Sequence, residues 1–193
     1  GMQWLQSTFA NRFNAFRGEH GHLFQGRYKC LIVEPGDALE DFDCGRPSMN
    51  DWFRRHAKRN QEASFSRTTV FTDGESGRIV GYVTLAAGQI EREYLPKAAR
   101  RNRPEAIPVI LLAQLAVDRR FQGRGFARQF LFYALKTCLA LSKDIGCFGV
   151  ITHPLDEEVR AFYHRFGFVD LPGDPHRAMI VRMTDLEQSG FGA

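Results

Sequence analysis

The chain has 193 residues, of which 44% are hydrophobic and 25% are charged, as in an ordinary globular domain. Lys and Arg number 26 and Asp and Glu 22, so the net charge of +4 permits an anionic partner without requiring one. No apolar run is long enough to cross a bilayer and no basic start precedes an apolar segment, so we expect neither a membrane span nor a secretory signal.

Residues 3–26 form the first distinct stretch. Aromatic and aliphatic residues recur there at helical spacing, and a polar run containing His20 and His22 follows. Two alternating histidines are more typical of a loop than of a metal site. We therefore expect a helical appendage over residues 1–27 and no metal.

From Tyr28 onward, short apolar or alternating runs predict strands, and longer amphipathic runs predict helices. Ser48 is a candidate N-cap for one helix, and 73–77 contains the turn residues of a hairpin. Residues 89–104 are expected to form a polar loop. We expect strands at 28–34, 67–72, 79–88, 109–117, 148–153 and 179–183, and helices at 48–62, 126–139 and 156–166.

An apolar run, residues 109–117, predicts a buried strand that ends at Asp118. A basic turn with two glycines, residues 122–127, then opens directly into an amphipathic helix. The first N–H groups of a helix lack intrahelical acceptors and carry partial positive charge. Strand, glycine turn and helix together therefore favour the binding of an anion.

The side chains of this turn support the same interpretation. Gly123 and Gly125 would let the backbone approach a ligand closely, while Arg124 and Arg128 add full positive charges. The glycine spacing matches neither the dinucleotide-binding motif nor the P-loop. The residues alone leave two alternatives open, a diphosphate site or an ordinary tight turn.

Two motifs carry a family resemblance. Gln122-x-x-Gly125-x-Ala127, preceded by 115–118, resembles the acetyl-coenzyme A signature of the GCN5-related N-acetyltransferases (GNAT), and 161–168 resembles the segment that follows it in that family. The resemblance covers about 28–185 and implies an α/β GNAT fold with a mixed, mostly antiparallel sheet flanked by helices, and an N-acetyltransferase that uses acetyl-CoA. It implies cofactor contacts at Leu115, Ala116, Val117, Gln122, Gly123, Arg124, Gly125, Phe126, Ala127 and Arg128.

In the resembling enzymes, a tyrosine at the place of Tyr163 points at the coenzyme A sulfur and protonates the leaving thiolate. Without the resemblance, the simpler interpretation is that Tyr163 packs beside Phe162 and Phe166. The resemblance also implies direct attack by an amine, with strand amides near 115–117 stabilising the oxyanion.

No residue stands out as the catalytic base. Glu91, Glu93, His153 and His164 are candidates with nothing in the sequence to separate them. An α-amine, with an ordinary pKa of about 7.7–8.0, is already partly neutral at pH 7, whereas a lysine amine, at about 10.4, is not. A site without an obvious base therefore suits an α-amine, such as that of an aminoacyl ester.

Phe42-x-Cys44-Gly45 followed by a short helix resembles the opening of the acetyltransferase toxins of bacterial toxin-antitoxin operons. That branch acts on aminoacyl-tRNA, so the resemblance implies this substrate and a ribbon-helix-helix antitoxin as partner, and a homodimer is common among the resembling proteins. A basic run before the cofactor strand is either a solvated loop or a contact with RNA phosphates, and the resemblance favours RNA. Its residues are Lys97, Arg100, Arg101 and Arg103.

Other functions remain open. An acetyltransferase for a small-molecule amine or a protein N-terminus would not need the basic run, and a coenzyme A-binding module would show no turnover. The four cysteines lack paired or metal-type spacing, so we expect buried free thiols in a reducing cytoplasm. They are Cys30, Cys44, Cys138 and Cys147.

Residues 3–35 also resemble a fragment of the REP-associated tyrosine transposases, through the run from Phe24 to Tyr28. That family's metal-binding histidine motif and nucleophilic tyrosine segment are absent from the sequence, so we expect no transposase activity. The expected division is an appendage at 1–27, an acetyltransferase domain at 28–186 and a frayed tail at 187–193.

Overall fold

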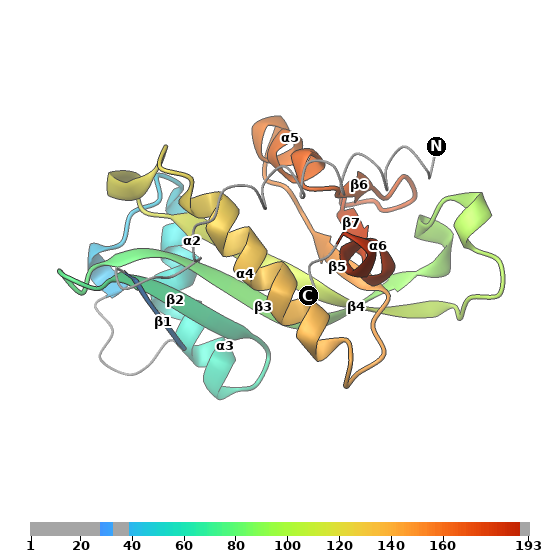
Figure 1. Cartoon of the computed structure of the whole chain (residues 1–193), viewed down its shortest axis with the longest axis horizontal. Coiled ribbons are helices and arrows are strands. Elements are labelled where there is room, and N and C mark those ends of the chain that lie inside the picture. Colours follow the sequence, from blue (N-terminus) through green and yellow to red (C-terminus); the bar gives the residue numbers. More distant parts are fainter. Residues whose placement is uncertain (1–27, 33–38, 190–193) are drawn as a thin grey trace. The chain divides into compact units, whose positions relative to one another are not determined.

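The computed structural model describes residues 28–32 and 39–189 and, for 28–32, the course of the backbone alone. The expected appendage at 1–27 and the transposase-like run therefore lie outside the described residues. Figure 1 shows the strands and helices of the described chain. The strands are β1 (Tyr28–Ile32), β2 (Arg67–Asp73), β3 (Ile79–Glu91), β4 (Ala106–Val117), β5 (Gly149–Thr152), β6 (Val169–Asp170) and β7 (Met179–Arg182).

The helices largely follow the predicted ranges. The π-helical turn η2 joins α2 to α3, so that 47–62 is helical throughout. The α-helices are α2 (Pro47–Trp52), α3 (Lys58–Glu62), α4 (Phe126–Leu141), α5 (Glu157–Arg165) and α6 (Met183–Gln188). The shorter turns are η1 (Leu39–Asp41), η2 (Phe53–Ala57), η3 (Arg92–Tyr94), η4 (Lys97–Ala99) and η5 (Arg119–Phe121).

The chain forms two compact units, to which β3, β4 and α4 each contribute. The first unit holds the described residues up to 86 together with 112–134, and its strand order is β1-β2-β3-β4. The second unit holds 87–111 and 135–189, with strand order β3-β4-β5-β7-β6. The β4–β5 pair is parallel, and β1–β2, β2–β3, β5–β7 and β6–β7 are antiparallel. The predicted mixed, mostly antiparallel α/β fold is confirmed.

The first unit has helices on both faces of its strands. Consecutive residues of a strand point to opposite faces. On β2, Val70 joins a core that contains Phe53 of η2, whereas Phe71 stacks on Phe130 of α4 with ring centroids 4.0 Å apart. Gly81 on β3 makes room for this stack, because a Cβ there would lie 2.4 Å from the Phe130 ring.

The second unit has its own apolar core, built from strand residues and the loops beside them. Strand β3 continues to Glu91 rather than ending at 88, so the expected loop from 89 to 104 begins too early. The reason is Ile90, which is 4% exposed and belongs to this core. Its other buried members are Leu95, Ile107, Val109, Ile151, Leu171, Ala178 and Ile180.

The prediction that Ser48 caps a helix is wrong. Helix α2 begins one residue earlier, with Pro47 in its first turn and no side-chain cap at Arg46. Proline suits this position because its fixed φ is helical and the N–H that it lacks would have no intrahelical partner. The side chain of Asn50 forms a local hydrogen bond instead: its Oδ1 accepts from the backbone N–H of Cys44 at 2.9 Å.

At the other end, Met183 starts α6 instead of finishing a strand. This helix runs to Gln188, and Ser189 after it is 3% exposed, with its hydroxyl donating to Leu186 O at 2.6 Å. The regular structure thus extends past 186, where the sequence suggested a frayed tail. None of the helices in the described part of the chain is long and apolar enough to cross a membrane.

Candidate functional site

The loop from Asp118 to Gly125, here called the cofactor loop, connects β4 to α4 as the sequence predicts. Gly123 and Gly125 have φ angles of +74° and +83°, in the left-handed region that favours glycine. No other atom lies within 4 Å of the place where a Cβ would stand on either residue. Both glycines therefore serve the turn itself and leave open space above it, which fits a phosphate group.

Helix α4 begins at Phe126 and has 16 residues, so its first N–H groups lie directly after the glycine turn. Phe126 is 6% exposed and packs against Phe121 and Phe130, which fixes the start of the helix. Ala127 and Arg128, in the first turn, are half-buried. This is the predicted arrangement for an anion, now with defined geometry.

The basic side chains of the loop divide into two kinds. Arg119 pairs with Asp43 at 3.3 Å, and Arg120 pairs with Asp118 at 2.8 Å, so their charges are largely compensated within the protein. Arg124 is exposed and lies 5.6 Å from the centroid of the Phe121 ring. Arg124 is therefore the better placed of these three for a phosphate.

Gln122, the first residue of the signature, acts through its side chain. Its amide Nε2 donates to Cys44 O at 3.0 Å and to Val117 O at 2.9 Å. Ala116 and Val117 are buried at the end of β4, and Leu115 is half-buried. Gln122 thus links the loop both to this strand and to the Phe-x-Cys-Gly segment.

Two acidic residues that hold this loop were not among the functional residues predicted from the sequence. Asp43 Oδ1 accepts from Gly45 N at 2.8 Å and from Asn50 Nδ2 at 2.7 Å, and these bonds hold the pKa of Asp43 below its usual range. Burial of Asp118 would raise its pKa, but hydrogen bonds from Arg120 and Asp43 outweigh burial and lower it. Asp118 directly follows the cofactor strand, which was the available signal.

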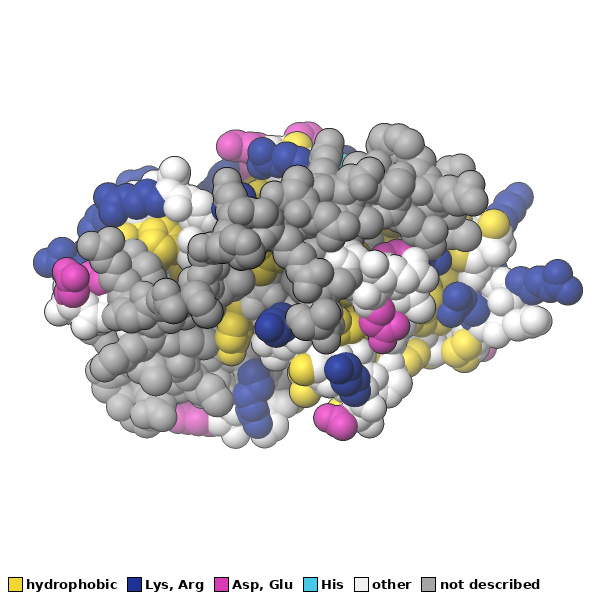
Figure 2. All heavy atoms as spheres, in the orientation of Figure 1, with side chains coloured by type: hydrophobic (Ala, Val, Ile, Leu, Met, Phe, Trp, Pro, Cys, Tyr) yellow, Lys and Arg dark blue, Asp and Glu magenta, His cyan; other side chains and the backbone are white. Residues whose placement is uncertain are grey.

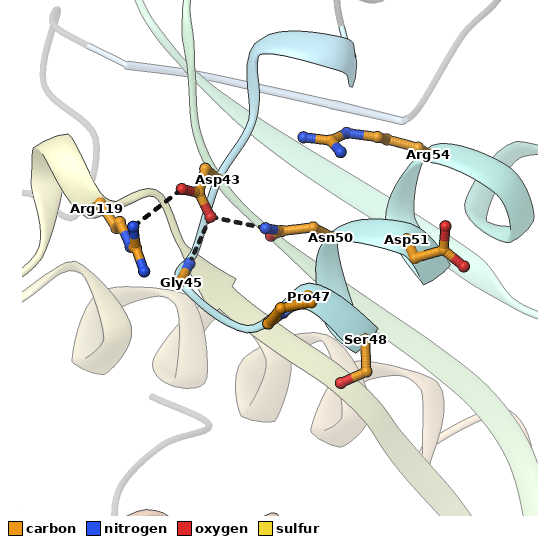
Figure 3. A pocket seen from close by; sticks show the side chains of 8 residues that line it. All are labelled: Asp43, Gly45, Pro47, Ser48, Asn50, Asp51, Arg54 and Arg119. Atoms are coloured by element: carbon orange, nitrogen blue, oxygen red, sulfur yellow. Dashed lines mark hydrogen bonds and ion pairs between the residues drawn. The ribbon is translucent and has the colours of Figure 1, made fainter.

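A pocket of about 770 Å³ lies beside Asp43 in the first unit (Figure 3). Figure 3 shows Asp43 between Arg119 on one side and Asn50 and Gly45 on the other. The two acidic and two basic side chains of the lining compensate one another, so the pocket lacks the excess positive charge of an anion site. The lining residues are Asp43, Gly45, Pro47, Ser48, Asn50, Asp51, Arg54 and Arg119.

Tyr163 lies in the second unit, on α5. Asp156 caps this helix by accepting the N–H of Val159 at 2.9 Å, and Gly167, with φ +84°, follows its end, as predicted. The tyrosine is 5% exposed and packs against Phe162 and Phe168.

Burial raises the pKa of Tyr163 to about 12, and a hydrogen bond with Thr152 opposes only part of this rise. The phenol therefore keeps its proton at neutral pH. A general acid needs that proton, so the protonation state of Tyr163 is compatible with the role that the resemblance implies.

The candidate bases are not equivalent. His164 is committed to the C-terminal end of α5, with Nδ1 3.1 Å from Phe168 O and Nε2 3.3 Å from Asp170. His153 lies 3.8 Å from Asp174, and Glu91 and Glu93 are exposed. All four candidates are exposed, so the structure singles out none of them as the base.

The basic run occupies η4 and the loop after it, also in the second unit. Figure 2 shows Lys and Arg side chains at the right of the view, where Figure 1 draws this loop. Arg100 donates to Leu95 O at 2.7 Å and to Glu93 O at 2.6 Å. Arg103 donates to Ala99 O at 2.9 Å and lies over the Phe148 ring. Lys97 and Arg101 are exposed, which leaves them the better placed of the four for RNA phosphates.

Three cysteines have described side chains, and all three are free: Cys44 and Cys138 are buried, while Cys147 is only half-buried. Among residues 39–189, no three potential ligands come together in a way that could hold a metal ion. His20 and His22 lie outside the described residues.

Comparison with known proteins shows the family to which the chain belongs. The model of the acetyltransferase (GNAT) domain matches residues 65–170. The tRNA-acetylating toxin of Mycobacterium tuberculosis is 38% identical over 149 residues, which are 77% of this chain and 89% of that protein. The solved structure of AtaT complexed with acetyl-methionyl-tRNAfMet is 28% identical, covers 83% of this chain and 97% of its own, and has a TM-score of 0.77. AtaTR bound with AcCoA is 26% identical, with coverages of 83% and 96% and a TM-score of 0.71.

The chain belongs to the GNAT acetyltransferases. It is an acetyl-CoA-dependent N-acetyltransferase, which confirms the enzyme class and the cofactor expected from the two motifs.

Proposed function

We propose that this enzyme transfers the acetyl group to the α-amine of an amino acid esterified to tRNA, and so blocks translation as a toxin. The observation that carries the proposal is the 38% identity with a tRNA-acetylating toxin over 89% of that protein's length. The fold shared with AtaT in complex with acetyl-methionyl-tRNAfMet supports it. An aminoacyl-tRNA substrate also puts the reaction in the cytoplasm, and an antitoxin of the ribbon-helix-helix class would be the protein partner.

In the proposed reaction the amine nitrogen attacks the acetyl carbonyl, and the carbon–sulfur bond breaks. Acetyl-CoA supplies the activated acetyl thioester. Tyr163 donates its hydroxyl proton to the departing sulfur, for which its raised pKa keeps it protonated. The attacking nitrogen releases one proton to solvent, and solvent returns one to the tyrosinate. Backbone amides at 115–117 hold the carbonyl oxygen, and the cofactor loop with Arg124 and Arg128 holds the diphosphate.

The test is acetyl transfer from labelled acetyl-CoA to total aminoacylated tRNA, with deacylated tRNA as the control. We expect label only when the aminoacyl group is present. Label on deacylated tRNA would contradict the proposal. So would an absence of label with acetyl-CoA binding intact, and the acceptor would then be a small-molecule amine or a protein N-terminus.

Tyr163→Phe tests the acid in the same assay. We expect turnover to fall by about a hundred-fold or more while acetyl-CoA still binds, because the variant lacks only the transferable proton. Tyr94→Phe makes the same chemical change at a half-buried tyrosine of η3 and should leave turnover unchanged. Equal activity of the two variants would make Tyr163 a packing residue.

Lys97 and Arg101 are the cations that we propose to contact tRNA phosphates. Replacing both with Ala should lower the slope of log affinity against log salt by up to about 2. The control is the replacement of Lys136 and Lys143, two other exposed lysines of the second unit, which should leave the slope unchanged. Equal slopes for both double variants would make the basic run an ordinary solvated surface.

A further inference from the structure

The cofactor loop is attached to a segment far away in the sequence, residues 41–45. The Arg119 N–H donates to Asp43 O at 2.8 Å, and Arg120 Nη2 donates to Asp41 O at 3.0 Å. The side chain of Gln122 adds its bond to Cys44 O at 3.0 Å. Three residues of the loop, at 119, 120 and 122, are thus fixed to the same short segment.

Asp118 lies at the centre of this attachment and is 1% exposed. Its Oδ1 accepts from the N–H and Nε of Arg120, at 2.9 and 2.8 Å. Its Oδ2 accepts from Arg120 Nη2 at 2.8 Å and from the N–H of Asp43 at 3.1 Å. Both oxygens are therefore saturated by fork-like, charge-assisted hydrogen bonds, which hold the carboxylate in one orientation.

We propose that Asp118 is a positioning residue for acetyl-CoA. It is too buried to touch the ligand, and it acts by holding Arg120 and the 41–45 segment so that the turn at Gly123 and Gly125 keeps the conformation that receives the diphosphate. The inference rests on the diphosphate site assigned to the cofactor loop and is independent of the identity of the acceptor.

Asp118→Asn tests this with a side chain of the same shape. The amide can accept at only one atom, so in either orientation its NH₂ group faces two donors, of which at least one belongs to Arg120. We expect the Kd for acetyl-CoA, measured by calorimetry, to rise about ten-fold or more. An effect of charge alone would lower this Kd instead, because removal of a negative charge near an anion site should tighten the binding of acetyl-CoA.

A second ligand separates positioning from general damage. S-acetylpantetheine carries the thioester and the pantetheine arm but no diphosphate, and its Kd is obtained by displacement of acetyl-CoA. The proposal requires this Kd to be nearly the same for Asp118→Asn and the wild type. A purely structural role would weaken both ligands alike, and unchanged or tighter binding of acetyl-CoA would also overturn the proposal.

Two further variants complete the design. Asp185→Asn removes a carboxylate that binds Arg182 at 2.7 Å far from the loop in sequence, and it should leave both Kd values unchanged. If Asp118→Asn does not fold, Arg120→Lys decides, because it keeps the charge and loses the fork. Selective weakening of acetyl-CoA then supports the proposal, and equal or no weakening overturns it. Neither measurement needs an acceptor, so failure of the aminoacyl-tRNA proposal would be seen separately.

Discussion

Thr68 on β2 and Thr84 on β3 face each other in register, with hydroxyl oxygens 2.9 Å apart and no exposed surface on either side chain. One hydroxyl donates and the other accepts, so each has a hydrogen-bond partner inside the first unit. Thr→Val at one position leaves a buried hydroxyl without this partner, and we expect a loss of about 1–3 kcal/mol in the free energy of unfolding. The double variant should recover most of that loss, as urea denaturation would show; additive losses would contradict the pairing.

Gly81 is expected to tolerate no side chain. A Cβ there would lie 2.3 Å from Ala116 O and 2.4 Å from the Phe130 ring, and the carbonyl belongs to backbone that cannot simply move aside. Gly81→Ala should reduce the free energy of unfolding by about 3 kcal/mol. Gly146→Ala is the control, because its Cβ would meet nothing within 4 Å, and its effect should stay within about 1 kcal/mol.

Asp118 should also make the free energy of unfolding depend on pH in the acidic range. Its pKa in the folded protein is lowered, so its contribution is present above the ordinary carboxyl pKa of about 3.9 and is lost as pH falls through the folded value. Urea unfolding should show Asp118→Asn less stable than the wild type at pH 7 by about 2 kcal/mol, with the difference shrinking below about pH 4.

The control for the acid dependence is Asp51→Asn. Asp51 is half exposed and pairs with Arg55, four residues later in the helical segment, so its replacement should change stability by less than about 0.5 kcal/mol at any pH. A difference between Asp118→Asn and wild type that stays constant down to pH 2 would refute the linkage.

Tyr163 should titrate late. Its folded pKa of about 12 lies above the ordinary value of about 10, so its contribution to stability is complete below pH 10 and is lost between pH 10 and 12. Phenolate absorbs at 295 nm, and the absorbance of the wild type minus that of Tyr163→Phe reports on Tyr163. This difference should stay near zero at pH 10.5. Near-ultraviolet circular dichroism checks that the fold persists, and a half-complete transition near pH 10 would contradict the burial.

The sequence predicted the strand, glycine turn and helix of the cofactor loop because these are contiguous and their physics is local. It could not predict the role of Asp118, whose partner Asp43 is 75 residues away, so that only the folded chain brings them together. The prediction that Ser48 caps a helix was wrong for a related reason. A local rule favours serine, but Pro47 starts the helix and Asn50 is committed to the backbone of Cys44.

The same division holds for the basic run. Residues 97–103 are visibly cationic in the sequence, but which charges remain available depends on the carbonyls that surround them. Arg100 and Arg103 bind carbonyl groups of their own segment, whereas Lys97 and Arg101 are exposed. No sequence pattern predicts side-chain hydrogen bonds of this kind. A count of charged residues therefore overestimates the number of cations available to bind RNA.

The π-helical turn η2, at 53–57, gives the helical segment an adjustable length. A π turn accommodates one more residue than an α-helical turn, so deleting one exposed residue there, Arg55, should convert it to regular α-helix. Phe53, at the start of the turn, and the helix after the turn would then keep their present faces toward the core. A deletion within α3 would instead rotate everything that follows by about 100°. We therefore expect a one-residue deletion to be tolerated at 53–57 and to be disruptive within α3.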